Sequence, residues 1–221
     1  MSRIIENPYD RLPLNDTNLI NYILSDEINV DNITLINTKE LKVTPFLQSD
    51  FLELKEDCTF TSIVTCIHYL YPEVASPQEI YDTAIGIYRR EYPSFQKIEG
   101  TIPFAIGHVY NEVFKYFKLP FYSIRSKYIN KVGFSYNTIK LQIDQNVPVI
   151  LSMWHDGRKC YKNHSLTVIG YIEFEMENVD PILKHIYPIK EKKLLMVYDN
   201  WSAEIRYVDL TQVSMISSIV F

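Results

Sequence analysis

The sequence has little glycine and no long hydrophobic run, and each shortage argues against a class of protein. Only 6 of its 221 residues are glycine, and none forms the phosphate-binding patterns GxxxxGK[ST] or GxGxxG. Nucleotide-binding folds of those two kinds therefore lack support. No apolar run approaches the roughly 18 residues that a membrane span needs, and the N-terminus has no hydrophobic signal segment. We expect a soluble, globular protein of the cytoplasm.

Cysteine and positive charge are also scarce. The three cysteines, Cys58, Cys66 and Cys160, are too few and too scattered for a disulfide framework, and a reducing compartment suits their odd number. Because HExxH and paired CxxC motifs are absent, we predict no metal and no other cofactor. The 22 Lys and Arg are interspersed among 27 Asp and Glu, so the net charge of −5 predicts no nucleic-acid partner. The oligomeric state is left open.

What the sequence does contain is a hydrophobic content of 47%, enough for a packed core. No repeat or flexible linker divides the chain, so we expect one domain over residues 1–221, with residues 1–41 as an N-terminal arm that holds one short helix. The periodicity predicts further helices at 58–71, 77–88, 103–117 and 136–145. It predicts strands at 147–154, 164–174, 193–199, 204–210 and 213–221. Helices followed by an antiparallel sheet define an α+β fold.

Cys58 is the first candidate for chemistry. Asp57 is a favourable N-cap, so Cys58 falls in the first helical turn, where free amide groups and the helix dipole favour a thiolate. The alternative is that Cys58 is a buried space-filling residue, as free cysteines commonly are. Cys66 and His68 lie about 12 Å and 15 Å further along the same helix, so neither partners Cys58, and both are interpreted as packing or surface residues.

A base for Cys58 has to come from another part of the chain. The candidates are His108, His155, His164 and His185. His164 is preferred because it opens a strand that is apolar on both faces, which would hold an imidazole rigidly at the sheet edge. His155, beside an Asp-Gly turn, is the second choice, and an ordinary turn histidine is the alternative for His164.

A catalytic imidazole needs an acceptor on its other nitrogen. Asp199 ends an apolar strand and is followed by Asn200 and Trp201, so a carboxylate or amide there is a candidate to orient the ring under an indole cover. An ordinary Asp-Asn turn is the alternative interpretation.

With Cys, His and Asp in this order, the chain resembles the papain-like cysteine peptidase superfamily, and most closely its bacterial branch of bacteriocin-leader (double-glycine) peptidases and their stand-alone relatives. The segments that carry the likeness are "LKVTPFLQSDFLELKEDCTFTSIVTCIHYL", "NHSLTVIGY" and "VYDNW", and the likeness spans about residues 42–209. Thr59 and Phe60 stand where that branch commonly has Gly and Pro. The stretch between the second and third segments is longer than the family pattern, which predicts an insertion at about residues 175–192.

The resemblance implies a helical half carrying Cys58, packed on a sheet carrying His164 and Asp199, with Gln48 completing an oxyanion hole. The implied activity is hydrolysis of a peptide or amide bond through an acyl-enzyme. Two alternatives remain open at this stage: an acyltransferase with the same triad, and a papain-like scaffold that only binds a peptide. The substrate, a peptide or another amide, is not identified by the sequence.

Overall fold

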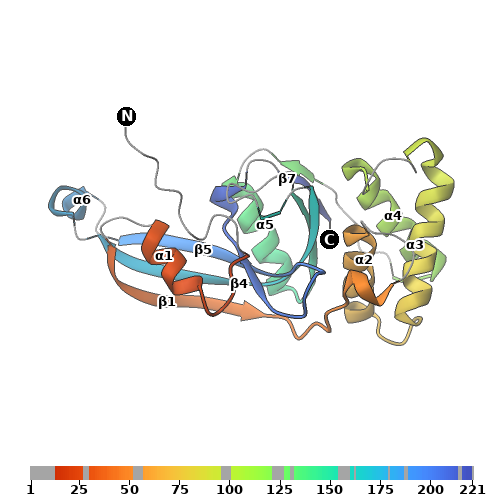
Figure 1. The fold of residues 1–221 in the computed structure, drawn as a ribbon, viewed down its shortest axis with the longest axis horizontal. Coiled ribbons are helices and arrows are strands. Elements are labelled where there is room, and N and C mark those ends of the chain that lie inside the picture. The colour runs from red at the N-terminus through yellow and green to blue at the C-terminus, as the bar shows by residue number, and fades with distance from the viewer. Residues whose placement is uncertain are drawn as a thin grey trace.

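A computed structural model gives the fold of the chain. The residues that it describes are 13–26, 30–51, 57–95, 101–120, 127–129, 132–153, 160–161, 163–178, 180–186, 189–213 and 216–220. Three helices gather at one end of the molecule and a sheet extends away from them, as Figure 1 shows. The predicted α+β class is confirmed.

The helical end consists of α2 (Cys58–Leu70), α3 (Pro77–Glu91) and α4 (Pro103–Tyr116). Helix α3 starts as predicted, because the Ser76 hydroxyl accepts a hydrogen bond from the Glu79 amide at 3.2 Å and proline occupies the first turn. The three helices bury their apolar faces against one another and form one hydrophobic core with Phe51. Ile150 of the sheet belongs to that same core, so the helices and the sheet are packed together.

A seven-stranded antiparallel sheet makes up the other end. Its strands follow the order β2-β7-β3-β4-β5-β6, and β1 pairs with the distal part of β4. Helix α5 (Val132–Asp144) packs on this sheet, with α1 (Leu19–Asp26) contributing to the same core. The strands are β1 (Val30–Glu40), β2 (Lys127–Ile129), β3 (Val149–Met153), β4 (His164–Asn178), β5 (Ile189–Tyr198), β6 (Arg206–Val208) and β7 (Ile216–Val220).

One region differs from the prediction. Residues 30–40, expected to be part of the N-terminal arm, form β1, which pairs along β4 from Val30 opposite Asn178 to Glu40 opposite Gly170. Residues 175–192, where we predicted an insertion, hold the end of β4 and the start of β5. The two strands form a long hairpin with the short helix α6 (Pro181–Ile186) at its tip (Figure 1).

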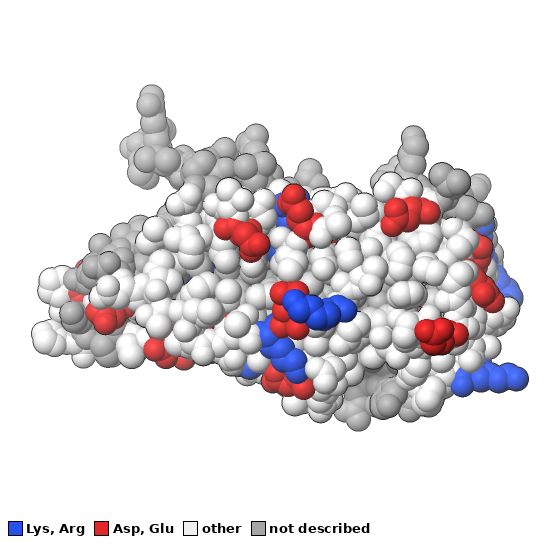
Figure 2. Space-filling view, turned by 90° about the horizontal axis from the view of Figure 1, so that it is seen from below, with Lys and Arg blue, Asp and Glu red and all other residues white. Residues whose placement is uncertain are grey.

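The surface carries charges of both signs. On the face shown in Figure 2, the described Lys and Arg residues stand singly or beside acidic residues. The described ion pairs include that of Lys42 with Glu40, at 2.8 Å. Among the described residues of that face there is no continuous cationic area. None of the described helices has the length and the apolar character that crossing a bilayer requires.

Candidate active site

Cys58 begins α2 and His164 begins β4, and the packing of α2 on β4 brings the two side chains together. Burial on its own raises the pKa of the Cys58 thiol, but the charge of His164 and hydrogen bonds with His164 and Ser165 outweigh it and lower that pKa. Burial likewise lowers the pKa of His164, yet Cys58 and Asp199 outweigh it and raise that pKa. The opposite shifts mean that the thiolate and the imidazolium stabilise each other.

The sulfur of Cys58 also receives a main-chain hydrogen bond. The amide of Ser165, the residue after His164, donates to Sγ at 3.4 Å. An N–H donor favours the charged form of its acceptor, so this contact supports the thiolate. This contact could not be predicted from the sequence, because every residue except proline carries the same main-chain donor.

The imidazole of His164 is fixed through its second nitrogen. Nε2 lies 2.7 Å from the main-chain oxygen of Asp199, and a carbonyl oxygen only accepts, so Nε2 carries a hydrogen and donates. The other nitrogen, Nδ1, is therefore the one available for the hydrogen bond with the Cys58 side chain. The ring lies against both Trp201, at 4.3 Å between centroids, and Tyr161, at 5.7 Å and parallel within 5°, and these two rings also contact each other at 5.6 Å.

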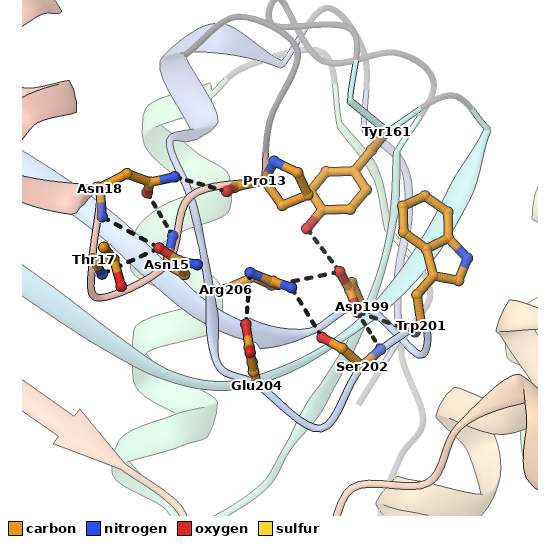
Figure 3. A network of polar contacts seen from close by, with 10 residues as sticks. All are labelled: Pro13, Asn15, Thr17, Asn18, Tyr161, Asp199, Trp201, Ser202, Glu204 and Arg206. Atoms are coloured by element: carbon orange, nitrogen blue, oxygen red, sulfur yellow. Dashed lines mark hydrogen bonds and ion pairs between the residues drawn. The ribbon is translucent and has the colours of Figure 1, made fainter.

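The carboxylate of Asp199 lies elsewhere than the sequence predicted. We expected it to accept from the imidazole, but Oδ1 accepts from the amides of Trp201 and Ser202 at 3.0 and 3.1 Å. Oδ2 accepts from the Tyr161 hydroxyl at 3.4 Å and faces Arg206 Nε at 3.6 Å (Figure 3). The carboxylate thus stabilises the turn after β5, and that turn presents the main-chain oxygen of Asp199 to His164.

Gln48 reaches the start of α2 through Asp57. It opens a short 3-10 helix, Gln48–Asp50, and its Nε2 donates to Asp57 Oδ1 at 2.8 Å. Because Asp57 immediately precedes Cys58, the side-chain amide of Gln48 is held next to the first turn of α2. Asp57 is fully buried and its other oxygen accepts from the Tyr81 hydroxyl. Asp57 occupies the N-cap position as predicted, but its side chain caps no helical amide.

The other described histidines, His68, His108 and His185, lie in other parts of the molecule. His108 lies beside Glu91, with Nε2 3.4 Å from Oε2, and His68 packs its ring edge-on against Phe46 on the helical end. His185 is exposed on α6, and His155, the second choice as base, lies outside the described residues. The described residues contain no cluster of three or more His, Cys, Asp or Glu side chains suited to hold a metal ion.

An α+β fold that pairs a thiol at a helix start with an imidazole at a strand start is the arrangement of a papain-like cysteine peptidase. Residues 40–205 match the Peptidase_C39 like family, and the chain belongs to that family. The predicted papain-like relationship is thereby confirmed, over nearly the same residues as the predicted 42–209. The family suggests a cysteine peptidase type of function. No curated protein gave a significant match.

Proposed function

We propose that the protein is a thiol-dependent hydrolase that cleaves a peptide or amide bond, with Cys58 as nucleophile and His164 as general base and acid. The observation that carries this proposal is the coupling of the two groups. Both are more than nine-tenths buried, where charge is costly, yet the pKa of Cys58 is lowered and that of His164 is raised. In a structural cysteine, by contrast, burial in an apolar core raises the pKa of the thiol.

The first half of the reaction follows from the positions of these groups. Nδ1 of His164 takes the thiol proton, and Sγ of Cys58 attacks the carbonyl carbon, forming a C–S bond and an oxyanion. The donors proposed for the oxyanion are the Gln48 side chain and the main-chain amide of Cys58, which lies in the first turn of α2, where amides have no intrahelical partner. Gln48 Nε2 has two hydrogens and its bond to Asp57 uses only one of them.

The second half uses His164 as an acid and then again as a base. Its Nδ1 proton passes to the leaving nitrogen as the C–N bond breaks, which leaves a thioester on Cys58. Water then attacks the thioester while His164 accepts its proton, and rupture of the C–S bond frees the acid. In this proposal Asp199 is a positioning residue, since its main-chain oxygen keeps the hydrogen on Nε2 throughout.

The test is a pH titration of thiol alkylation by iodoacetamide, with the labelled residue located by mass. We expect Cys58 to react well below the ordinary cysteine pKa of about 8.5, and His164→Ala to move its profile up to that value. Cys66 is an internal control, because burial raises its pKa and it should stay unlabelled while the protein is folded. In Cys58→Ser the fast label should disappear.

A Cys58 that is inert, or that reacts as an ordinary thiol whether or not His164 is present, contradicts the proposal and favours the peptide-binding scaffold. If the pair is active, turnover of a fluorogenic peptide library with and without hydroxylamine separates hydrolysis from acyl transfer. A hydrolase forms mostly free acid from its acyl-enzyme, whereas a transferase forms product only when the amine is supplied.

A further inference from the structure

Asn200 is the residue at which the segments of the candidate site meet. It follows Asp199, is fully buried, and has a φ of 63°, in the left-handed region that asparagine tolerates better than most side chains. The conformation directs its side chain back toward α2 and β4 instead of continuing strand β5.

The side-chain amide of Asn200 joins the nucleophile's helix to the histidine's strand. Nδ2 lies 3.0 Å from the Cys58 oxygen, 2.9 Å from the Ser62 hydroxyl and 3.0 Å from the Ser165 oxygen. Two of these acceptors are main-chain carbonyls, so the nitrogen and not the oxygen of the amide must face them. One buried side chain thus fixes the first turn of α2 against the first residues of β4.

The main chain of Asn200 extends the same connection to Gln48. Its main-chain carbonyl accepts a hydrogen bond from the main-chain N–H of Gln48 at 2.9 Å. The preceding carbonyl, that of Asp199, accepts from Nε2 of His164. The segments that carry Gln48, Cys58 and His164 are therefore all bonded to the dipeptide Asp199–Asn200. A shift of this turn would change the position of all three side chains at once.

We propose that Asn200 is a positioning residue that sets the distance and orientation between Cys58 and His164 and so maintains the thiolate–imidazolium pair. The inference rests on the proposed function, since it concerns the same pair. The side-chain amide of Asn200 contacts the Cys58 and Ser165 carbonyls and the Ser62 hydroxyl, none of which is a reacting group. Its contribution therefore acts through the placement of Cys58 and His164, and it should be visible in the pKa of the thiol.

The experiment compares Asn200→Gly with the wild type in the alkylation titration. Glycine adopts the positive φ freely, so this change removes the amide contacts without straining the turn. Asn146→Gly is the matched control, because Asn146 has a similar φ of 61° but lies exposed after α5. We expect Asn200→Gly to raise the pKa of Cys58 by about one unit, which slows alkylation about tenfold at a pH below that pKa. Asn146→Gly should leave the profile unchanged.

A folded Asn200→Gly whose titration coincides with that of the wild type overturns the inference, even if its stability is reduced, because a purely structural role changes stability and not the thiol pKa. If Asn200→Gly does not fold, the same comparison on Asn200→Ser, which is neutral and has a single shorter donor, decides by the same criterion. The proposed function is tested separately, by comparing the alkylation of Cys58 in His164→Ala and in the wild type. If Cys58 of the wild type already reacts as an ordinary thiol, both proposals are wrong.

Discussion

Replacing Tyr81 by phenylalanine tests how the buried Asp57 carboxylate is held beside Cys58. Asp57 is fully buried and accepts hydrogen bonds from the Tyr81 hydroxyl and from Gln48 Nε2. The Tyr81 ring stacks on Phe51 at 4.3 Å between centroids and 5° between planes, and phenylalanine keeps that contact. Tyr81→Phe therefore removes one donor from a buried carboxylate and keeps the stacking on Phe51.

Hydrogen bonds to charged groups contribute about 1.5–3 kcal/mol, so Tyr81→Phe should lower the free energy of unfolding by about 2 kcal/mol. At about 2–4 °C per kcal/mol for a chain of this size, the melting temperature should fall by about 4–8 °C. Urea denaturation followed by circular dichroism measures the change, with Tyr116→Phe, at an exposed position, as the control. A Tyr81→Phe protein within about 0.5 kcal/mol of the wild type would refute this account of Asp57.

Three further substitutions test the packing of the sheet and helices. In Gly170→Ala the new Cβ would overlap the main-chain oxygen of Lys39 in β1, so we expect a loss of about 1–3 kcal/mol or more in urea denaturation. Gly86→Ala, in α3, meets no atom within 4 Å and should stabilise by about 0.5–1 kcal/mol. Lys192→Met leaves the buried Asp209 without the ammonium now 2.5 Å away, which should cost about 3–5 kcal/mol. Burial raises the pKa of Asp209, but Lys192 and Thr211 outweigh it and lower that pKa. The ionised Asp209 therefore contributes to the free energy of unfolding above the unfolded pKa of about 3.8, and this contribution is lost as the pH falls through the lower folded pKa. In a pH series of urea melts, Lys192→Met should move that loss to higher pH, and an unchanged profile would contradict the assignment.

The helices were predictable because their signals are local. The Ser76 cap with proline in the first turn gives the start of α3, and regular apolar spacing gives α4. Strand β4 was recognisable because apolar residues on both faces are typical of a strand covered on both sides, and its first eight residues are buried. In each case the information lies within about fifteen residues of sequence.

Strand β1 was missed because its signal is not local. Residues 30–40 contain Asn and Asp at positions typical of turns, and most of their described side chains are exposed. What makes the segment a strand is hydrogen bonding to β4, more than a hundred residues later in the chain.

In the candidate site, the residues could be selected from the sequence, but the contacts between them could not. Sequence reasoning could select Cys58 and His164 because the chain has only 3 cysteines and 5 histidines, and Asp199 because it ends an apolar strand. It could not assign their contacts, because two of the groups that hold the pair are the main-chain oxygen of Asp199 and the main-chain amide of Ser165. Such groups are common to all residues, so only the path of the chain identifies them.

That dependence on chain path explains why a turn residue has so much influence on the proposed chemistry. A side-chain acceptor can adjust to a shifted partner by changing its rotamer, whereas a main-chain carbonyl moves only if the backbone moves. Placing the carbonyl of Asp199 on His164 therefore requires a turn with one fixed geometry, and the left-handed conformation of Asn200 supplies it. The Asp199 carboxylate stabilises the same turn from its other side through the amides of Trp201 and Ser202. On this reasoning the acid acts on the imidazole indirectly, by holding its own main chain in place.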